Sequence, residues 1–573
     1  MIRLFKYALL LAFVCTGWGC QQNEDVVIKL FHTTDIHGNF FPFDFINNEP
    51  MSGGMARVST FMKEQRAKYD NVLLVDGGDL LQGQPSAYYY NYIDTTSRHL
   101  CSQILDYLDY DLVTIGNHDL ETGHSVYDRW IAESGIPILG GNAICDDNSQ
   151  VSYLPAYATF IKDGVKIAIV GMITPAIPAW LPKQLWSGMY FEDIDVVCRR
   201  LLPQLKEQEQ PDFIIGLFHS GVFDSEMISY KENVGMDMAQ NFDGFDLILC
   251  GHDHIPYSEK VDNVSGDSIW LIDPANNANY ISDVTITVRK ERGKITEKHI
   301  DAKLVDISTI PVDEDYMKDF ASQYKAIEQY VDQPIGEVAE TMKAEDGLFG
   351  PSTFVDFIHQ VQLGLTNAEI SLVAPLSIDA SIDQGTLYTR DLFKLYPYEN
   401  MLYTMEMTGH EIRYALEFCY AIWVNRMEKP GDHLLLLETD DGHFQFQNPP
   451  YAFDSAAGIR YTVDVTKPII NRVNILSMAD GTPFDPNRTY KVAVNSYQGS
   501  GGASVLTAGA GISVQNLPSR ILAATEKDMR YYIAEYIREK KIINPQPLYH
   551  WKFVPESLAK TGAERDRALL IGD

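Results

Sequence analysis

Five apolar runs between residues 26 and 256 each end in side chains that can bind a metal ion, and this repeated ending constrains the fold most. The runs read VVIKLFHTTDIHG, NVLLVDGGDLLQG, DLVTIGNHD, DFIIGLFHSG and FDLILCGHDH. The candidate ligands are Asp35, His37, Asp79, Asn117, His219, His252 and His254. Short apolar runs that alternate with amphipathic stretches are typical of α/β units with a buried sheet. Because ligands of such sheets bind beyond the carboxyl ends of the strands, we expect these side chains to meet in one crevice.

The donor chemistry of this set favours a catalytic metal site. Carboxylates, imidazoles and one amide, without any thiolate, suit Mn²⁺, Zn²⁺ or Fe better than Ca²⁺ or a closed structural zinc. The set is too large for one tetrahedral ion and sufficient for two ions if one carboxylate bridges them. Two ions about 3.5–4 Å apart can hold a hydroxide and bind an oxyanion, which suits in-line attack on phosphorus.

A single histidine at a strand end is more often a satisfied polar residue than a ligand, so the prediction depends on all five strand ends together. His32, His99, His124 and the histidines after residue 300 lack this context. We expect them to be surface or packing residues.

At these strand ends the chain resembles the calcineurin-like metallophosphoesterases, whose pattern is D-x-H, G-D, G-N-H, H and G-H-x-H in this order. The corresponding motifs here are DIHG, GGD, GNHD, FHSG and GHDH. The second half narrows the resemblance to the two-domain 5′-nucleotidases and 2′,3′-cyclic-nucleotide phosphodiesterases, which are exported enzymes of similar length. The resemblance covers roughly residues 26–525. It implies an α/β fold with an N-terminal αββα sandwich and a second α/β domain that binds the substrate.

The resemblance also implies roles for single residues. Asp35, His37, Asp79 and His254 correspond to the ligands of one metal, and Asp79, Asn117, His219 and His252 to those of the other, with Asp79 as the bridge. His118 corresponds to the residue that donates to the phosphoryl oxygen or leaving group. Many relatives read GNHEFD, and their last Asp orients this histidine. The sequence here is GNHDLE, so we expect Glu121 to take that place; the alternatives are Asp119 or no partner.

The second domain departs from the family pattern. Relatives stack a base between two aromatic rings, and NSYQGSGGASVL places Tyr497 as one ring. The other ring is Phe453 or Tyr451, and the alternative is that these aromatic residues belong to the core. Asp379 stands where relatives carry an arginine, and Ala503 replaces their usual acid. A carboxylate facing a phosphate is repulsive, which counts against a standard nucleotide pocket.

The N-terminus has the features of an export signal. Arg3 and Lys6 precede the short apolar stretch YALLLAFV, and residues 1–19 are predicted to be a signal peptide. Gly19 before Cys20 resembles a bacterial lipoprotein cleavage site, which would place a lipid on Cys20. Cys15 is the poorer alternative, and an ordinary cleaved signal is the other interpretation. The predicted location is the periplasm or the outer membrane or cell surface, with a lipid anchor in the membrane.

Charge and cysteine usage exclude some classes of protein. A formal net charge of −32 argues against nucleic-acid binding through phosphates, which requires an excess of lysine and arginine. The five cysteines after residue 20 are widely spaced, so we expect neither a disulfide framework nor a zinc knuckle.

These observations predict a domain order and a function. Residues 20–300 form the dimetal domain, 301–334 a connecting helix, 335–553 the second domain and 554–573 a loosely held polar tail. The predicted function is an exported phosphoesterase that hydrolyses nucleotide phosphate esters, of the 5′-nucleotidase or 2′,3′-cyclic phosphodiesterase type, by a metal-activated hydroxide. The alternatives are a hydrolase of non-nucleotide esters and a catalytically silent ligand-binding lipoprotein.

Overall fold

The computed structural model describes residues 24–147, 149–224, 230–440 and 443–572. The predicted signal peptide and Cys20 lie outside these residues. Among the helices of these residues, none combines the length and apolar character that a membrane span requires.

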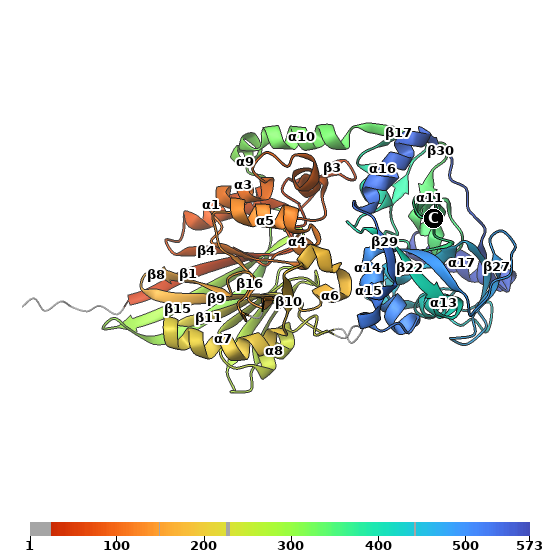
Figure 1. Cartoon of the computed structure of the whole chain (residues 1–573). Helices are drawn as coiled ribbons and strands as arrows, with labels where there is room; N and C mark the ends of the chain where they lie inside the picture. Colours follow the sequence, from red (N-terminus) through yellow and green to blue (C-terminus); the bar gives the residue numbers. More distant parts are fainter. Residues whose placement is uncertain (1–23, 148, 225–229, 441–442, 573) are drawn as a thin grey trace, which may run out of the picture.

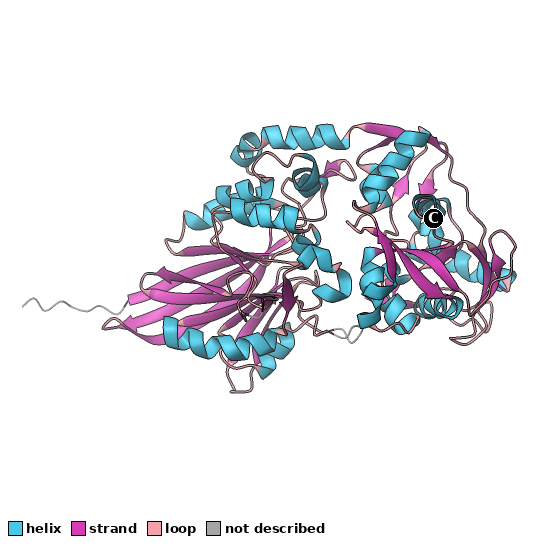
Figure 2. Ribbon diagram, viewed as in Figure 1, coloured by secondary structure: helices cyan, strands magenta, loops and turns pink. Residues whose placement is uncertain are grey.

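The first domain contains two six-stranded sheets (Figures 1 and 2). In spatial order, the first sheet consists of β16 (Lys294–Asp306), β15 (Tyr280–Glu291), β1 (Glu24–Thr33), β4 (Val72–Asp76), β5 (Leu112–Thr114) and β6 (Ile138–Leu139). The second consists of β13 (Tyr257–Asp262), β14 (Ser268–Asp273), β12 (Leu247–Cys250), β11 (Phe213–His219), β9 (Val165–Ile173) and β8 (Tyr157–Lys162). Strands β1, β4, β5 and β6 are parallel, as are β9, β11, β12 and β14.

The alternation of side chains along the strands explains why the two sheets stack. Ile28 and Leu30 of β1 point into a core that they share with Ile215 of β11, between the sheets. Phe31 points to the other face and packs beneath the outer helices. The outer helices are α1 (Met55–Arg66), α3 (Leu100–Tyr107) and α5 (His124–Glu133) on the first sheet, and α7 (Ile194–Glu209) and α8 (Gly235–Asn241) on the second. The predicted αββα sandwich is therefore confirmed.

Two helices, and not one, connect the domains. Strand β16 runs to Asp306, beyond the expected boundary at residue 300. The connection then forms α9 (Glu314–Asp319) and α10 (Ala321–Val331), which are separated at Phe320. Figure 1 shows α10 leading toward the second domain, where β17 (Pro334–Val338) begins. The break lets α9 dock on the first domain, where the Tyr316 hydroxyl donates to the Phe40 carbonyl at 2.8 Å.

The second domain is built on a five-stranded sheet. In spatial order its strands are β25 (Ser455–Ala457), β19 (Ile370–Val373), β28 (Thr489–Asn495), β22 (Leu402–Thr408) and β29 (Ile521–Ala524). Val492 and Val494 face a core with α13 (Gly409–Trp423), whereas Ala493 faces α11 (Thr353–Leu365) and α16 (Met529–Lys540). The domain also contains two three-stranded sheets, β21 (Gly385–Tyr388)–β17–β30 (Ile542–Ile543) and β27 (Val473–Met478)–β26 (Ile459–Asp464)–β31 (Trp551–Val554). Two pairs of short strands, β18 (Met342–Lys343)–β20 (Ser381–Ile382) and β23 (Leu437–Asp440)–β24 (His443–Phe446), lie beside them.

The expectation of a loosely held tail after residue 553 is wrong. Residues Glu556–Leu570 form helix α17, which packs on the second domain. Asp566 is fully buried and accepts hydrogen bonds from the backbone N–H groups of Leu434 and Leu435 at 2.7 and 2.8 Å. The small residues Ala559 and Gly562 form the docking face, so the helix needs no large apolar stripe that the sequence would have revealed.

A buried charge cluster joins the two domains. Arg530 of α16 is 2 % exposed, and its Nη2 lies 2.9 Å from Glu399 Oε1. Its guanidinium carbon lies 4.5 Å from the ring centroids of both Tyr88 and Phe393. Tyr88 belongs to α2 (Pro85–Tyr88) of the first domain. Tyr92 belongs to the π-helical turn that follows (Tyr89–Ile93), and its hydroxyl donates to Glu399 Oε2 at 2.8 Å. The first domain therefore supplies two of the three aromatic residues that contact this ion pair.

Replacing Arg530 by methionine tests whether this cluster stabilises the domain contact. Arg530→Met leaves Glu399 buried without its cation, which we expect to cost about 3–5 kcal/mol in the free energy of unfolding. Arg538→Met on the same helix removes a half-exposed ion pair with Glu535 and should cost less than about 1 kcal/mol. Urea unfolding of both variants measures the difference, and equal losses would contradict the assigned role.

Candidate dimetal centre

The seven candidate ligands lie at the carboxyl ends of strands from both sheets. Asp35 and His37 follow β1, Asp79 follows β4, and Asn117 opens α4 (Asn117–Glu121) after β5. His219 is the last residue of β11, and His252 and His254 follow β12. Parallel strands direct their carboxyl ends to one edge, so residues more than 200 positions apart meet there.

Asp35, His37 and His254 form the first ligand group. Their nearest atoms are His37 Nε2 and His254 Nε2, which are 3.0 Å apart. Asp35 Oδ1 lies 3.3 Å from His254 Nε2 and 3.8 Å from His37 Nε2. Donor atoms about 2.0–2.2 Å from one ion lie roughly 3–3.5 Å from each other, so these separations fit a common cation.

Asp79, Asn117, His219 and His252 form the second ligand group. His219 Nε2 lies 3.2 Å from Asp79 Oδ2 and 2.9 Å from Asn117 Oδ1. His252 offers a ring nitrogen within 4.8 Å of the Asp79 and His219 donor atoms. Asp79 is also linked to the first group, because its backbone carbonyl accepts a hydrogen bond from the His37 N–H at 2.9 Å.

Two buried carboxylate oxygens test whether these groups fit a cation. Asp35 Oδ1 and Asp79 Oδ2 are fully buried without a hydrogen-bond partner, and both face histidine nitrogens. The other oxygen of each carboxylate is occupied: Asp35 Oδ2 accepts from the His252 N–H at 2.9 Å, and Asp79 Oδ1 from the His118 N–H at 2.8 Å. A buried anionic oxygen without a donor is costly, and a divalent ion would satisfy both of them. The residues present therefore fit a metal in each group.

In two of the candidate histidine ligands, the ring nitrogen Nδ1 contacts a backbone carbonyl. His219 Nδ1 lies 2.8 Å from the Gly77 carbonyl, and His37 Nδ1 lies 3.2 Å from that of Gln82. Since the carbonyl accepts the Nδ1 proton, each Nε2 keeps its lone pair for the ligand group.

The backbone at the site is strained. Asp35, His37, Asp79, His252 and His254 all have φ between 50° and 86°, a region that non-glycine residues rarely adopt. The glycines of the motifs allow close approach, because a Cβ on Gly116 would lie 2.1 Å from Asp79 Oδ1 and one on Gly251 2.7 Å from Asp35 Oδ2. Such strain persists where the surrounding structure enforces it, and it is common at functional sites.

The ionisation states also suit a cation. Burial alone would raise the pKa of Asp79, but the nearby His219 and His118 hold it well below its usual range. Burial lowers the pKa of His37 to about 4, so its imidazole is neutral at pH 7. Asp79 outweighs burial and raises the pKa of His219 to about 10, and Asp35 likewise raises that of His254. Since metal ions bind neutral imidazoles, a cation would displace a proton from each of these two histidines.

Glu121, and not Asp119, contacts His118. Glu121 Oε2 lies 2.6 Å from His118 Nδ1, and the His118 side chain is 26 % exposed. Burial would lower the pKa of His118, whereas Asp79 and Glu121 raise it to about 9. Asp119 instead holds the backbone, because its carboxylate accepts from the N–H groups of Gly116, Asp79, Leu80 and Leu81 at 2.8–3.0 Å. It thereby ties the loop that carries Asp79 to the start of α4, where Asn117 lies.

A cleft of about 650 Å³ between the domains opens beside the first ligand group. His37 and Gln82 line it from the first domain, and Asp379, Tyr398 and Tyr451 from the second. Among the described residues that line it, none is a lysine or arginine, whereas Asp44 and Asp379 are both acidic. The structure therefore places Asp379 at the cleft, as the sequence suggested.

The prediction of Phe453 as a stacking ring is wrong. Phe453 is 1 % exposed and stacks on Trp423 inside the second domain, with ring centroids 5.5 Å apart. Tyr451 is 37 % exposed and lies at the cleft, with its ring 6.1 Å from that of Tyr497. Tyr497 lies on α14 (Ser496–Ser500), which contacts α6 (Ile177–Trp180) of the first domain. One residue separates Phe453 from Tyr451, and composition alone does not distinguish the buried ring from the exposed one.

The remaining histidines and cysteines agree with the sequence analysis. His32 is fully buried beside Ser282, and His99 caps α3 by accepting from the Cys101 N–H at 3.2 Å. All five cysteines in the described residues are free, and Cys250 is buried among apolar side chains.

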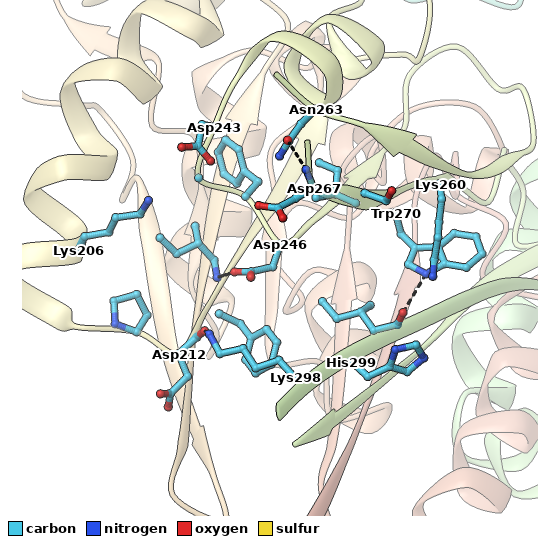
Figure 3. A pocket seen from close by; sticks show the side chains of 18 residues that line it. Lys206, Asp212, Asp243, Asp246, Lys260, Asn263, Asp267, Trp270, Lys298 and His299 are labelled. Carbon is cyan, nitrogen blue, oxygen red and sulfur yellow. Dashed lines mark hydrogen bonds between the residues drawn. The ribbon is translucent and has the colours of Figure 1, made fainter. Parts of the chain in front are cut away.

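A second hollow of about 560 Å³ lies at the opposite end of the strands, at the amino ends of β11 and β12 (Figure 3). Lys206, Lys260 and Lys298 line it together with Asp212, Asp243, Asp246 and Asp267. None of the predicted site residues is among its lining residues. Its mixed charges select neither anions nor cations.

Sequence reasoning missed Glu232, whose Oε1 lies 3.0 Å from His252 Nε2. It lies in the polar segment between β11 and α8, and no motif marks it. An isolated glutamate in a loop carries no signal that links it to a histidine 20 positions later.

Comparison with known proteins agrees with this geometry. Residues 28–256 match the family model of the calcineurin-like phosphoesterases, and residues 334–508 match that of the 5′-nucleotidase C-terminal domain. A trifunctional nucleotide phosphoesterase of Bacillus subtilis is 26 % identical over 93 % of this chain, which spans 39 % of that protein. A 2′,3′-cyclic-nucleotide 2′-phosphodiesterase/3′-nucleotidase of Haemophilus influenzae is also 26 % identical, over 93 % of this chain and 88 % of its own.

Solved structures show the same two-domain fold. A Staphylococcus aureus protein assigned to the 5′-nucleotidases superposes with a TM-score of 0.76 at 20 % identity, over 92 % of this chain and 100 % of the other. The sandwich and its strand-end cluster define a hydrolase of the phosphoesterase class. The chain belongs to the calcineurin-like phosphoesterases and carries a 5′-nucleotidase C-terminal domain.

Truncation of Phe453 should lower the free energy of unfolding much more than truncation of Tyr451. Phe453→Ala empties a fully buried site and should cost about 3–5 kcal/mol in the free energy of unfolding. Tyr451→Ala removes an exposed ring and should cost less than about 1 kcal/mol. Denaturant unfolding measures both variants; a larger loss for Tyr451→Ala would contradict the assignment of Phe453 to the core.

Proposed function

We propose that this protein is an exported, metal-dependent phosphoesterase that hydrolyses nucleotide phosphate esters, of the 5′-nucleotidase or 2′,3′-cyclic phosphodiesterase type. The observation that carries the proposal is the pair of ligand groups, Asp35–His37–His254 and Asp79–His219–His252, of which His37 lines the interdomain cleft. Asp35, His37 and His254 would hold one ion with Asp79. Asn117, His219 and His252 would hold the other, with Asp79 as the bridge. Mn²⁺, Zn²⁺ and Fe fit this donor set.

When bound, two such ions supply a hydroxide nucleophile at neutral pH and neutralise charge on the phosphoryl oxygens. The protein's own contribution is centred on His118. Glu121 holds its Nδ1 at 2.6 Å, which fixes the ring orientation and directs Nε2 away from the carboxylate. His118 Nε2 then donates to a phosphoryl oxygen or to the leaving group in the transition state.

The cleft supports a substrate with a flat group attached to the phosphate. With the phosphate at the ligand groups, the remainder of the substrate extends toward the second domain. Tyr451 presents its ring there, and the face of such a ring can stack on a nucleobase; the Tyr497 ring lies edge to face with it at 6.1 Å. The relatives named as nucleotide phosphoesterases support the same substrate class.

Two alternatives compete with this proposal. Asp379 and Asp44 at the cleft favour a hydrolase of non-nucleotide esters, because carboxylates repel any further anionic group of the substrate. A catalytically silent ligand-binding lipoprotein would have no use for an oriented His118, so the His118–Glu121 contact favours turnover. Export through residues 1–19 and lipid attachment at Cys20 are part of the proposal; the family of exported enzymes that the chain resembles supports them.

A substrate panel with a matched variant tests the proposal. The full chain, supplied with Mn²⁺, should release phosphate from 5′-AMP or open 2′,3′-cyclic AMP. His118→Ala should lower kcat/KM by about 10²–10⁴-fold, because it removes a positioned proton donor. His443→Ala, on an exposed strand of the second domain, serves as the control and should leave the rate within about twofold.

The panel also separates the alternatives. Cleavage of p-nitrophenyl phosphate without cleavage of either nucleotide would support the non-nucleotide hydrolase. No cleavage of any ester by a metal-loaded protein would contradict an enzymatic function and support a binding protein. Unchanged rates in His118→Ala would contradict the role of this histidine.

A further inference from the structure

Glu232 lies against the back of a candidate ligand. Its Oε1 is 3.0 Å from His252 Nε2, and both side chains are largely shielded, with 19 % of Glu232 and 12 % of His252 exposed. The Trp180 ring packs on the same imidazole at 5.4 Å, and the His219 ring lies at 5.3 Å on another side. The imidazole is therefore enclosed, and Glu232 is its carboxylate contact.

The backbone holds Glu232 firmly in this place. The Ser220 hydroxyl donates to the Glu232 carbonyl at 2.8 Å, and the Gly221 N–H donates to Asn233 Oδ1 at 2.8 Å. The Gly235 N–H donates to the Gly221 carbonyl at 3.0 Å. The segment with Glu232 is thus joined to the residues that directly follow His219, so the loop that carries one ligand also carries the partner of another.

The contact decides which nitrogen of His252 can face the ligand group. A carboxylate accepts the Nε2 proton, so Nδ1 keeps its lone pair. A carboxylate on the distal nitrogen also raises the basicity of an imidazole ligand. Among the four candidate histidines, in the described part of the chain, His252 alone has a ring nitrogen on a carboxylate from outside the two ligand groups; Nδ1 of His219 and of His37 contacts a neutral carbonyl.

We propose that Glu232 is a positioning residue that orients His252 toward the second ligand group and strengthens metal binding there. This inference rests on the proposed two-metal function. Burial raises the pKa of Tyr451 at the cleft, and the negative charge of Glu232 raises it further.

Metal binding to the full chain provides the test. After removal of metal by chelation, equilibrium dialysis against Mn²⁺ should yield two bound ions in the wild type. Glu232→Ala should raise the Kd of one of them about 10–100-fold. Glu232→Gln, which keeps an oxygen acceptor but loses the charge, should give a smaller increase. Glu209→Gln, which removes a carboxylate paired with Lys166 at 2.6 Å far from the site, is the matched control and should leave both Kd values unchanged.

Thermal unfolding distinguishes positioning from a merely structural role. Glu232→Gln should unfold at the wild-type temperature without metal and show a smaller rise in Tm when Mn²⁺ is added, because less binding energy stabilises the folded state. A lower Tm without metal, combined with an unchanged rise, would contradict the inference. If the wild type and both Glu232 variants bind two ions with the same Kd values, the role of Glu232 is contradicted and the two-metal function is not. If the wild type binds fewer than two ions, the proposed two-metal function is contradicted together with the role of Glu232.

Discussion

The Asp79 carboxylate is the interaction on which the site depends. It is buried, it is held ionised by neighbouring histidines, and one oxygen is fixed by the His118 N–H while the other has no hydrogen-bond donor. Asp119 holds the same loop through three backbone N–H groups, Asp79's own among them, and also accepts from the Gly116 N–H of the neighbouring segment. A buried anion in this state is expensive unless a cation accompanies it, so the geometry of both ligand groups is organised around a positive charge.

The two-domain architecture completes what the strand ends begin. The first domain supplies the ligand groups, His118 and Glu121, whereas both domains form the surface that would receive the rest of a substrate. The buried Arg530 and Glu399 pair and the tyrosines of α2 and the π-turn fix the domains beside this cleft. Positioning and chemistry are therefore divided between domains, and the domain contact contributes to the site as much as the strands do.

Much of the first domain could be predicted because its motifs are local: each ligand lies within a few residues of the end of an apolar strand, and the sheet order brings them together. The pairing of His118 with Glu121 could also be expected, since the two residues share one helical turn. Glu232 could not, because its contact with His252 depends on how a polar loop folds back on β11. Phe453 and Tyr451 are neighbouring aromatic residues, and the structure distinguishes them by burial. Contacts with Trp423 and other residues far away in the sequence decide which ring is buried. Helix α17 was missed because its docking relies on a buried aspartate and small residues, and not on an apolar stripe.

The central claim is that two cations share Asp79, and anomalous diffraction from crystals soaked in Mn²⁺ tests it most directly. The account predicts two anomalous peaks about 3.5–4 Å apart. One should lie among Asp35, His37 and His254, the other among Asn117, His219 and His252, with the Asp79 carboxylate between them. A single peak, or two peaks of which neither contacts Asp79, would contradict the account.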